Sequence, residues 1–170
     1  MSKKNEINKL SKIVRPHIGI ITNIAEAHIK NFKNINEIAK AKSEILNNIC
    51  KGGNVILNKD DSFFGYFFKL AKVKKLNIST FSLNKNSDIY LKKIIKSKKN
   101  YKVTININNK NYFFYIKYNF ENYIKNLLAT LSVLNLLSLN FNKLKFHFLK
   151  FDLPEGRGDL KKINIYKKKI

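Results

Sequence analysis

Lys42 occupies an unusual position for a lysine in this sequence. An Asn34-x-x-Glu37 capping signature predicts the start of a helix. The face that Lys42 shares on that helix is otherwise apolar, with isoleucines at i−4, i+3 and i+7: Ile38, Ile45 and Ile49. A charged amine is costly there, so we expect the pKa of Lys42 to fall and the neutral amine to be reactive. Lys40 should point to solvent. The alternative is that the Lys42 side chain extends to the rim of the apolar stripe and stays charged.

His28 is the second candidate for chemistry. The run of β-branched residues at 17–24 is typical of a buried parallel strand and ends in Thr22-Asn23. In open α/β sheets, ligands bind beyond the carboxyl ends of the strands, which is where His28 falls. A lone loop histidine is more often structural than a ligand. His28 nevertheless comes shortly before the predicted helix that carries Lys42, which makes the two residues a candidate site.

The elements that would position this site alternate between strand and helix. The pattern predicts three strands and two helices in this part of the chain: strands 17–24, 54–58 and 77–81, helices 35–49 and 61–75. From residue 88 it changes to alternating strands around a turn at 108–111, an antiparallel unit at about 86–118. Helices are expected again at 122–138 and 142–150. The predicted fold class is α/β, a parallel sheet with crossover helices plus a small antiparallel sheet insertion.

Asp60 and Asp61 form an acidic pair that could serve acid and base chemistry. Because carboxylates favour a helix N-terminus, we expect both to cap the helix that follows them. Asn58, two residues earlier, has no predicted chemical role.

The charge balance of the chain is strongly basic. A formal charge of +23 would ordinarily indicate a nucleic acid or an anionic membrane as the partner. However, lysine, asparagine and isoleucine make up 80 of the 170 residues, and their codons are rich in A and T, so a biased genome is a sufficient cause. The basic residues are also scattered over separate predicted edges. We therefore expect no nucleic acid partner. The alternative, from a different class, is a noncatalytic basic module that binds nucleic acid or another anion.

The sequence predicts a cytoplasmic protein without a membrane span. Cys50 is the single cysteine, which excludes an internal disulfide. The first twelve residues lack the apolar segment of a signal peptide. The longest apolar stretch, 127–139, is too short to cross a bilayer and is expected to be a core helix.

Three motifs, in a fixed order, resemble those of the ATP-dependent Mur ligases of peptidoglycan synthesis. They are TNIAEAH at 22–28, AKSEI at 41–45 and GGNVILNKDD at 52–61. Ala27 before the histidine and Glu44-Ile45 after the lysine resemble the branch of the family that adds D-alanyl-D-alanine to UDP-N-acetylmuramoyl-tripeptide. The order and spacing of three motifs make the resemblance specific.

The resemblance implies roles for four residues and two cofactors, ATP and Mg²⁺. His28 is similar to the family's magnesium-binding histidine, and Lys42 to the lysine that reacts with carbon dioxide to become a carbamate, an oxygen ligand for a hard metal. Asn126 matches an asparagine that contacts adenine. Arg157, one of only two arginines, matches an arginine that faces the nucleotide phosphates. One departure is that residues 120–122 are Phe-Glu-Asn, where the family usually has Gly-x-His.

The resemblance also implies an internal piece of a longer ligase. No G-x-x-x-x-G-K-[ST] phosphate loop occurs in the sequence, and in the family this loop lies upstream of the first motif. We expect residues 1–155 to be a partial central domain and 156–170 to be a linker and the start of a C-terminal domain. The truncation could be a gene-prediction artefact, a split gene or a decayed remnant.

The reaction implied for the whole enzyme is ATP-dependent amide formation through an acyl phosphate. Its partners would be UDP-N-acetylmuramoyl-tripeptide and D-alanyl-D-alanine, together with the missing N- and C-terminal parts if the gene is split. We expect the chain to be inactive on its own.

Overall fold

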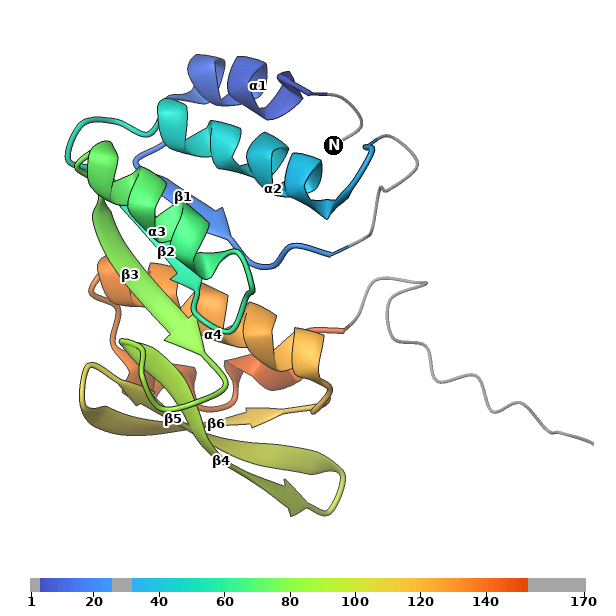
Figure 1. Cartoon of the computed structure of the whole chain (residues 1–170). Helices are drawn as coiled ribbons and strands as arrows, with labels where there is room; N and C mark the ends of the chain where they lie inside the picture. Colours follow the sequence, from blue (N-terminus) through green and yellow to red (C-terminus); the bar gives the residue numbers. More distant parts are fainter. Residues whose placement is uncertain (1–3, 26–31, 153–170) are drawn as a thin grey trace, which may run out of the picture.

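The computed structural model describes residues 4–25 and 32–152, which form a mixed six-stranded sheet flanked by helices (Figure 1). The strands lie in the sheet in the order of the sequence. They are β1 (Ile18–Ile21), β2 (Asn54–Asn58), β3 (Asn77–Ser82), β4 (Ile89–Ser97), β5 (Asn100–Ile107) and β6 (Lys110–Ile116). The α-helices are α1 (Glu6–Val14), α2 (Ile35–Ser43), α3 (Phe64–Val73) and α4 (Glu121–Leu136). Three short 3₁₀ helices follow α2 and α4: η2 (Glu44–Asn47), η3 (Phe141–Leu144) and η4 (His147–Lys150).

The predicted α/β fold class, with a parallel part and an antiparallel part, is confirmed. Strands β1 to β4 are parallel, and β4 to β6 are antiparallel. The antiparallel unit continues the parallel sheet, because β4 pairs with the end of β3 through Phe81–Ile89 and Ser82–Tyr90. The hairpin between β5 and β6 turns at Asn108 and Asn109, which both have positive φ angles as a tight turn of this kind requires.

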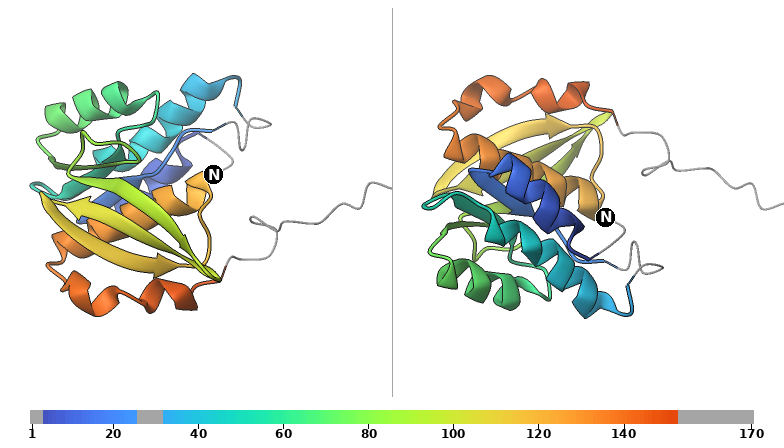
Figure 2. Two further views of the ribbon diagram at one scale, coloured as in Figure 1. Left: turned by 90° about the horizontal axis from the view of Figure 1, so that it is seen from below. Right: turned by 90° about the horizontal axis from the view of Figure 1, so that it is seen from above.

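Helices cover both faces of the parallel part of the sheet (Figure 2). On one face, Val55 and Leu57 of β2 pack with Phe67 of α3 and with the α2 segment. On the other face, Ile56 packs with α4, in the same cluster as the antiparallel strands. Successive strand residues point to opposite faces, so a continuous apolar run in β2 serves both layers.

Helix α2 begins where the capping signature predicts. The Asn34 side chain accepts a hydrogen bond from the Glu37 amide at 3.0 Å, and the Glu37 carboxylate accepts one from the Lys33 amide at 3.0 Å. The predicted continuous helix to residue 49 is wrong, since α2 ends at Ser43 and tightens into η2. The apolar face nevertheless persists through the 3₁₀ turn, because Ile49 is buried.

Two further elements differ from the sequence expectation. Helix α1 was not predicted, and its N-terminal amides are capped from a distance: the Glu44 carboxylate accepts from the amides of Asn5 at 2.7 Å and Asn8 at 3.0 Å. The helix predicted at 142–150 is instead η3 and η4. The Tyr115 amide of β6 donates to the Lys145 carbonyl at 2.8 Å, which holds the middle of this segment against the sheet rather than in a helix.

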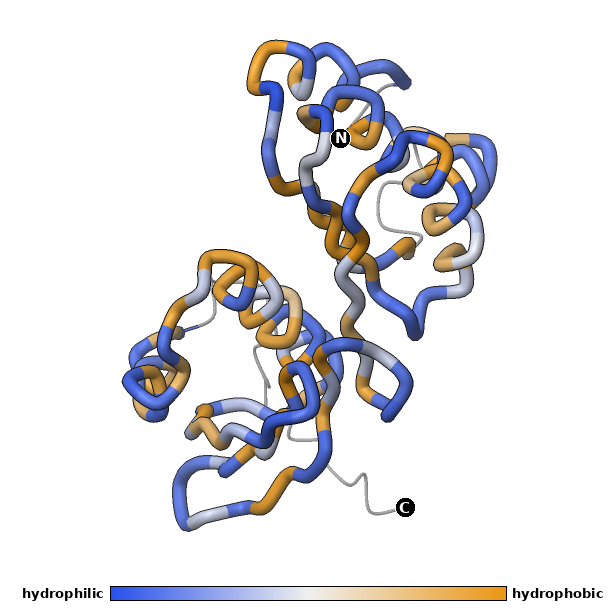
Figure 3. Tube along the Cα trace, turned by 90° about the vertical axis from the view of Figure 1, so that its left-hand side faces the viewer, coloured by the Kyte–Doolittle hydropathy of each residue, from blue (hydrophilic) through white to orange (hydrophobic). Residues whose placement is uncertain are grey.

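Hydrophobic and hydrophilic residues alternate along most of the chain trace (Figure 3). This is the pattern of elements with one buried face and one solvated face. In the described ranges, no helix combines the length and apolar character that a bilayer crossing needs. The expected domain boundary at 155/156 and the second expected domain lie outside the described residues.

Two glycines give a matched test of how tightly the entry to β2 is packed. An alanine Cβ at position 53 would lie 2.7 Å from Ile49 Cγ2 and 2.8 Å from the carbonyl oxygens of Cys50 and His17. We expect Gly53→Ala to lower the free energy of unfolding by more than about 1 kcal/mol, because two of these neighbours are backbone atoms that cannot move aside. Denaturant titration measures this loss.

Gly65→Ala is the control for this experiment. An alanine Cβ at Gly65, in the first turn of α3, would meet no atom within 4 Å. This variant should gain up to about 1 kcal/mol from helix propensity. Equal losses in the two variants would contradict the packing argument.

Candidate functional site

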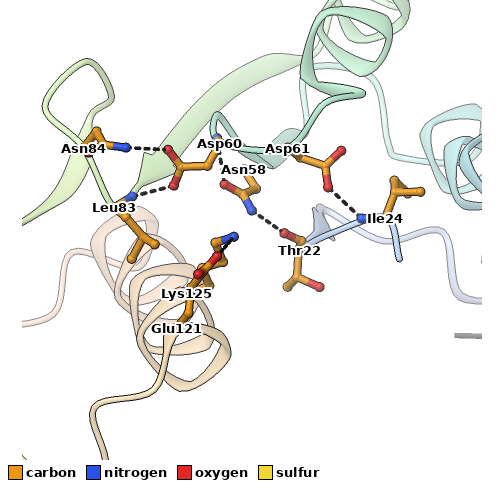
Figure 4. A network of polar contacts seen from close by, with 9 residues as sticks. All are labelled: Thr22, Ile24, Asn58, Asp60, Asp61, Leu83, Asn84, Glu121 and Lys125. Atoms are coloured by element: carbon orange, nitrogen blue, oxygen red, sulfur yellow. Dashed lines mark hydrogen bonds and ion pairs between the residues drawn. The ribbon is translucent and has the colours of Figure 1, made fainter. Parts of the chain in front are cut away.

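The carboxyl ends of the parallel strands are joined by polar side chains from the last residue of β2 and from the turn that follows it (Figure 4). Asn58 is 3% exposed, and its amide nitrogen donates to the Thr22 carbonyl, just after β1, at 2.8 Å. Its amide oxygen accepts from the Asp60 backbone N–H at 2.9 Å. Both ends of the buried amide are therefore paired, and Asn58 fixes β1 against the turn that leaves β2.

The two aspartates of the motif extend this network in opposite directions. Asp60 accepts from the Leu83 amide at 2.6 Å and so holds the loop after β3. Asp61 accepts from the Ile24 amide at 2.6 Å and from the Phe63 amide at 2.9 Å. The prediction that both cap α3 is wrong for Asp60. Asp61 binds the amide of Phe63, the residue before α3, and the helix has no side-chain N-cap.

Lys42 is half-buried, whereas Lys40 is exposed, as their opposite helix faces predict. The Lys42 Nζ donates to the Asn23 carbonyl oxygen at 2.7 Å, two residues beyond the end of β1. Burial lowers the pKa of Lys42 below the ordinary 10.5, and the nearby Asp61 carboxylate opposes part of that shift. Lys42 therefore has the partly desolvated, more easily neutralised amine that the sequence predicts.

A groove of about 220 Å³ opens beside Lys42. Its other lining residues come from α1, η2 and the end of β1: Ile7, Ile20, Ile21, Thr22 and Ile45. Among the described residues, β1 is an edge strand whose one neighbour is β2. The groove has room for a small molecule such as carbon dioxide beside the amine.

Among the described residues, the donors near Lys42 suit a hard metal ion better when the lysine carries a carbamate. In the described part of the chain, no three or more His, Cys, Asp or Glu side chains cluster in a way that could hold a metal. The side-chain oxygens of Thr22 and Asn23 lie 3.4 Å apart at the end of β1. A carbamate on Lys42 would add anionic oxygens of the kind Mg²⁺ prefers. His28 lies outside the described residues, so its expected place beside Lys42 stays a prediction.

Asn126 lines a different groove, also of about 220 Å³. This groove lies between α4 and the η4 segment, with aromatic and aliphatic walls: Tyr123, Leu127, Thr130, Phe148 and Phe151. Burial raises the pKa of Tyr123, so its hydroxyl stays protonated at neutral pH. Asn126 is exposed at the edge of the groove, where its amide could meet a planar ligand. Lys42 and Asn126 do not share one groove, and Arg157 lies outside the described residues.

Sequence reasoning missed the positioning contacts of Asn58, Asp61 and Glu44. Each belongs to a motif whose residues were considered for chemistry, yet each binds backbone amides or carbonyls of another element. The local signal in the sequence is the polar run Asn-x-Asp-Asp, which begins at the last residue of a buried strand and indicates side-chain bonds to neighbouring strand ends.

The lowered pKa of Lys42 can be measured by competitive labelling with 1-fluoro-2,4-dinitrobenzene across pH 6 to 11. Because burial disfavours the charged form, we expect the midpoint of Lys42 labelling to be lower in the folded chain than in urea, where it should be about 10.4. Peptide mapping gives the midpoint. Lys40, in the same segment, controls for reagent quality at each pH, and a folded-state midpoint at or above the urea value would contradict the burial argument.

Comparisons with known proteins agree with this architecture. The family model described as "Mur ligase middle domain" matches residues 1–134. No curated protein sequence matches the chain. Among solved structures, MurF from Acinetobacter baumannii is similar with a TM-score of 0.81 and 25% identity over 92% of this chain, but only 34% of its own length is covered.

Two more distant structures share the fold. MurF from Thermotoga maritima, solved in complex with ADP, has a TM-score of 0.77 and 19% identity, covering 92% of this chain and 35% of its own. A point mutant of L. casei FPGS has a TM-score of 0.63 and 14% identity, covering 75% of this chain and 30% of its own. The chain thus spans about a third of the length of these proteins. Since the family model covers well over half of its residues, the chain belongs to the Mur ligase family.

Proposed function

We propose that this chain is part of the central ATP-binding domain of a cytoplasmic ligase that joins D-alanyl-D-alanine to UDP-N-acetylmuramoyl-tripeptide. The observation that supports this best is the half-buried Lys42 at the carboxyl end of β1, with a lowered pKa, in a chain of the Mur ligase family. Ala27 and the Glu44-Ile45 pair favour the D-alanyl-D-alanine branch. The similarity to A. baumannii MurF at 25% identity favours the same branch.

In this proposal Lys42 becomes a carbamate. The lone pair of its neutral amine attacks the carbon of CO₂, an N–C bond forms, one C–O π pair moves to oxygen, and the nitrogen loses a proton to water. A lowered pKa increases the fraction of amine that can react. The product keeps one N–H and gains anionic oxygens, so Lys42 and His28 together would hold Mg²⁺. When bound, this ion would neutralise charge on the nucleotide phosphates.

The remaining site residues of the chain would bind ATP. The groove beside Asn126 offers an aromatic wall for a planar base and an exposed amide at its edge. Arg157 would face the phosphates with its planar guanidinium.

In the complete enzyme, a carboxylate oxygen of the tripeptide attacks the γ-phosphorus and ADP leaves. The amine of D-alanyl-D-alanine then attacks the acyl phosphate, and phosphate leaves with formation of the amide.

The carbamate is tested directly by ¹³C NMR of the chain in ¹³C-bicarbonate buffer near pH 8. We expect a carbamate carbonyl resonance that disappears in Lys42→Ala and remains in Lys40→Ala, because Lys40 is exposed on the other face of α2. The measurement needs neither nucleotide nor substrate. A resonance that survives Lys42→Ala, or no resonance in any folded variant, would refute the metal-ligand role of Lys42.

We expect residues 1–170 alone to show no ligation. The sequence lacks a phosphate loop, and losing even one group that positions or stabilises phosphate typically costs on the order of 10²-fold or more in rate. Phosphate release with ATP, Mg²⁺, UDP-N-acetylmuramoyl-tripeptide and D-alanyl-D-alanine measures this. Release clearly above that of Lys42→Ala would show that the chain is a complete catalyst.

One surface favours a second candidate function, the binding of a polyanion. Residues 89–120 contain eight lysines and no carboxylate. The Nζ atoms of Lys102 and Lys145 lie 4.5 and 4.4 Å from the centre of the Phe113 ring, and the rings of Tyr115 and Phe146 stack at 4.9 Å. Aromatic stacking beside lysines can bind single-stranded nucleic acid. A steep fall of affinity with salt, reduced in Lys102→Ala, would favour this function over the ligase.

A further inference from the structure

One peptide group at the end of β1 is held at both of its polar ends. Its carbonyl, from Asn23, accepts from the Lys42 Nζ at 2.7 Å. Its amide N–H, from Ile24, donates to an Asp61 carboxylate oxygen at 2.6 Å. Because a trans peptide is planar and its C=O and N–H point in opposite directions, the two side chains lie on opposite sides of the same unit.

We propose that Asp61 is a positioning residue for Lys42, and that it acts through this peptide group. By fixing the Ile24 N–H, the carboxylate fixes the direction in which the Asn23 carbonyl points, and that carbonyl holds the Lys42 amine beside the open groove. This inference rests on the proposed function of Lys42, because the position of the amine matters only if Lys42 reacts.

The peptide needs such an anchor because the sheet does not hold it. The β1–β2 ladder runs only from Ile18 to Ile21, so the Asn23–Ile24 peptide lies beyond its last pair. The outer edge of β1 has no neighbouring strand among the described residues. The orientation of the Asn23–Ile24 peptide therefore depends on its two side-chain partners.

Asp61 is a rigid anchor for this purpose. Its second carboxylate oxygen accepts from the Phe63 amide at 2.9 Å, which ties it to the start of α3. Asn58 fixes the backbone just before Asp61, because its buried side chain donates a hydrogen bond to the Thr22 carbonyl. Hydrogen bonds from backbone amides to a carboxylate are charge-assisted. The carboxylate at the N–H and the amine at the C=O also polarise the peptide group in the same direction.

Asp60 provides a matched control. It is the adjacent residue with the same side chain, but its carboxylate accepts from the Leu83 amide at 2.6 Å, at the end of β3. Replacing Asp60 removes a comparable bond from the same turn without touching the Asn23–Ile24 peptide. The difference between the two positions separates positioning of Lys42 from general loosening of the turn.

The experiment is NMR of the isotope-labelled chain of residues 1–170, without CO₂ or nucleotide. We compare Asp61→Asn, Asp61→Ala and Asp60→Asn with the parent chain. One readout is hydrogen exchange of the Ile24 amide, which should accelerate by about tenfold or more in Asp61→Ala and by less in Asp61→Asn, which keeps an oxygen acceptor. The other is the set of NOEs between the Lys42 ε-methylene and the Asn23 α-proton, next to the carbonyl that accepts from the Lys42 amine. These should weaken in both Asp61 variants and persist in Asp60→Asn.

Two outcomes would overturn the proposal. A folded Asp61 variant that keeps both the slow exchange and the NOEs would mean that Asp61 serves only to bind the Phe63 amide. Equal losses in Asp60→Asn would mean that the whole turn has loosened. If Asp61→Ala does not fold, the near-isosteric Asp61→Asn decides the matter. Since no readout involves CO₂ or ATP, an absent carbamate would refute the proposed function and leave this result unchanged.

Discussion

The architecture of the candidate site depends on hydrogen bonds that begin where the sheet ladder stops. Parallel strands hold one another only along their paired length, and β1 contributes four residues. Beyond that, the backbone of residues 22–24 must find other partners, or it would lose the bonds that water offered in the unfolded chain. Asn58, at the end of β2, and Asp61, in the turn after it, supply those partners. One short polar turn thus sets the place of the strand end that receives Lys42.

The same constraint explains how a lysine can sit on an apolar helix face. Lys42 is partly desolvated by the α1 and η2 segments, yet its amine finds a carbonyl oxygen within 2.7 Å. A donor without that acceptor would be more costly at this depth. Helix α1, which helps to close this region, is itself capped by the Glu44 carboxylate, only two residues after Lys42. The AKSEI motif therefore provides both the amine and the packing around it.

The sequence predicted the periodic elements well and the long-range contacts poorly. Strand β2 has the predicted bounds, and the Asn34 cap and the Asn108–Asn109 turn lie where local chemistry requires them. Helix α1 was missed, because its cap comes from Glu44, more than 35 residues away. The segment expected as a helix at 142–150 forms η3 and η4 instead, and its Lys145 carbonyl accepts a hydrogen bond from the Tyr115 amide of β6. Periodicity predicted that Lys42 is less exposed than Lys40. It could not show that Asp60 binds the Leu83 amide after β3, whereas Asp61 binds the Ile24 amide after β1.

The distribution of carboxylates shows how this lysine-rich chain keeps its local order. Eight Asp and Glu residues fall in the described part of the chain. Five of these accept hydrogen bonds from backbone amides: Glu37, Glu44, Asp60, Asp61 and Asp88. By contrast, the ion pairs Lys4–Glu37, Lys117–Asp152 and Lys125–Glu121, in which both partners are described, each have an exposed partner, and such pairs add little stability. A backbone amide cannot be mutated away, and a charge-assisted bond to it fixes loop geometry.

A drift of composition toward lysine can therefore raise the net charge to +23 without disturbing the carboxylates that hold strand and helix ends. The pKa of Lys42 is accordingly lowered by burial, and the carboxylate that opposes this shift is the anchored Asp61.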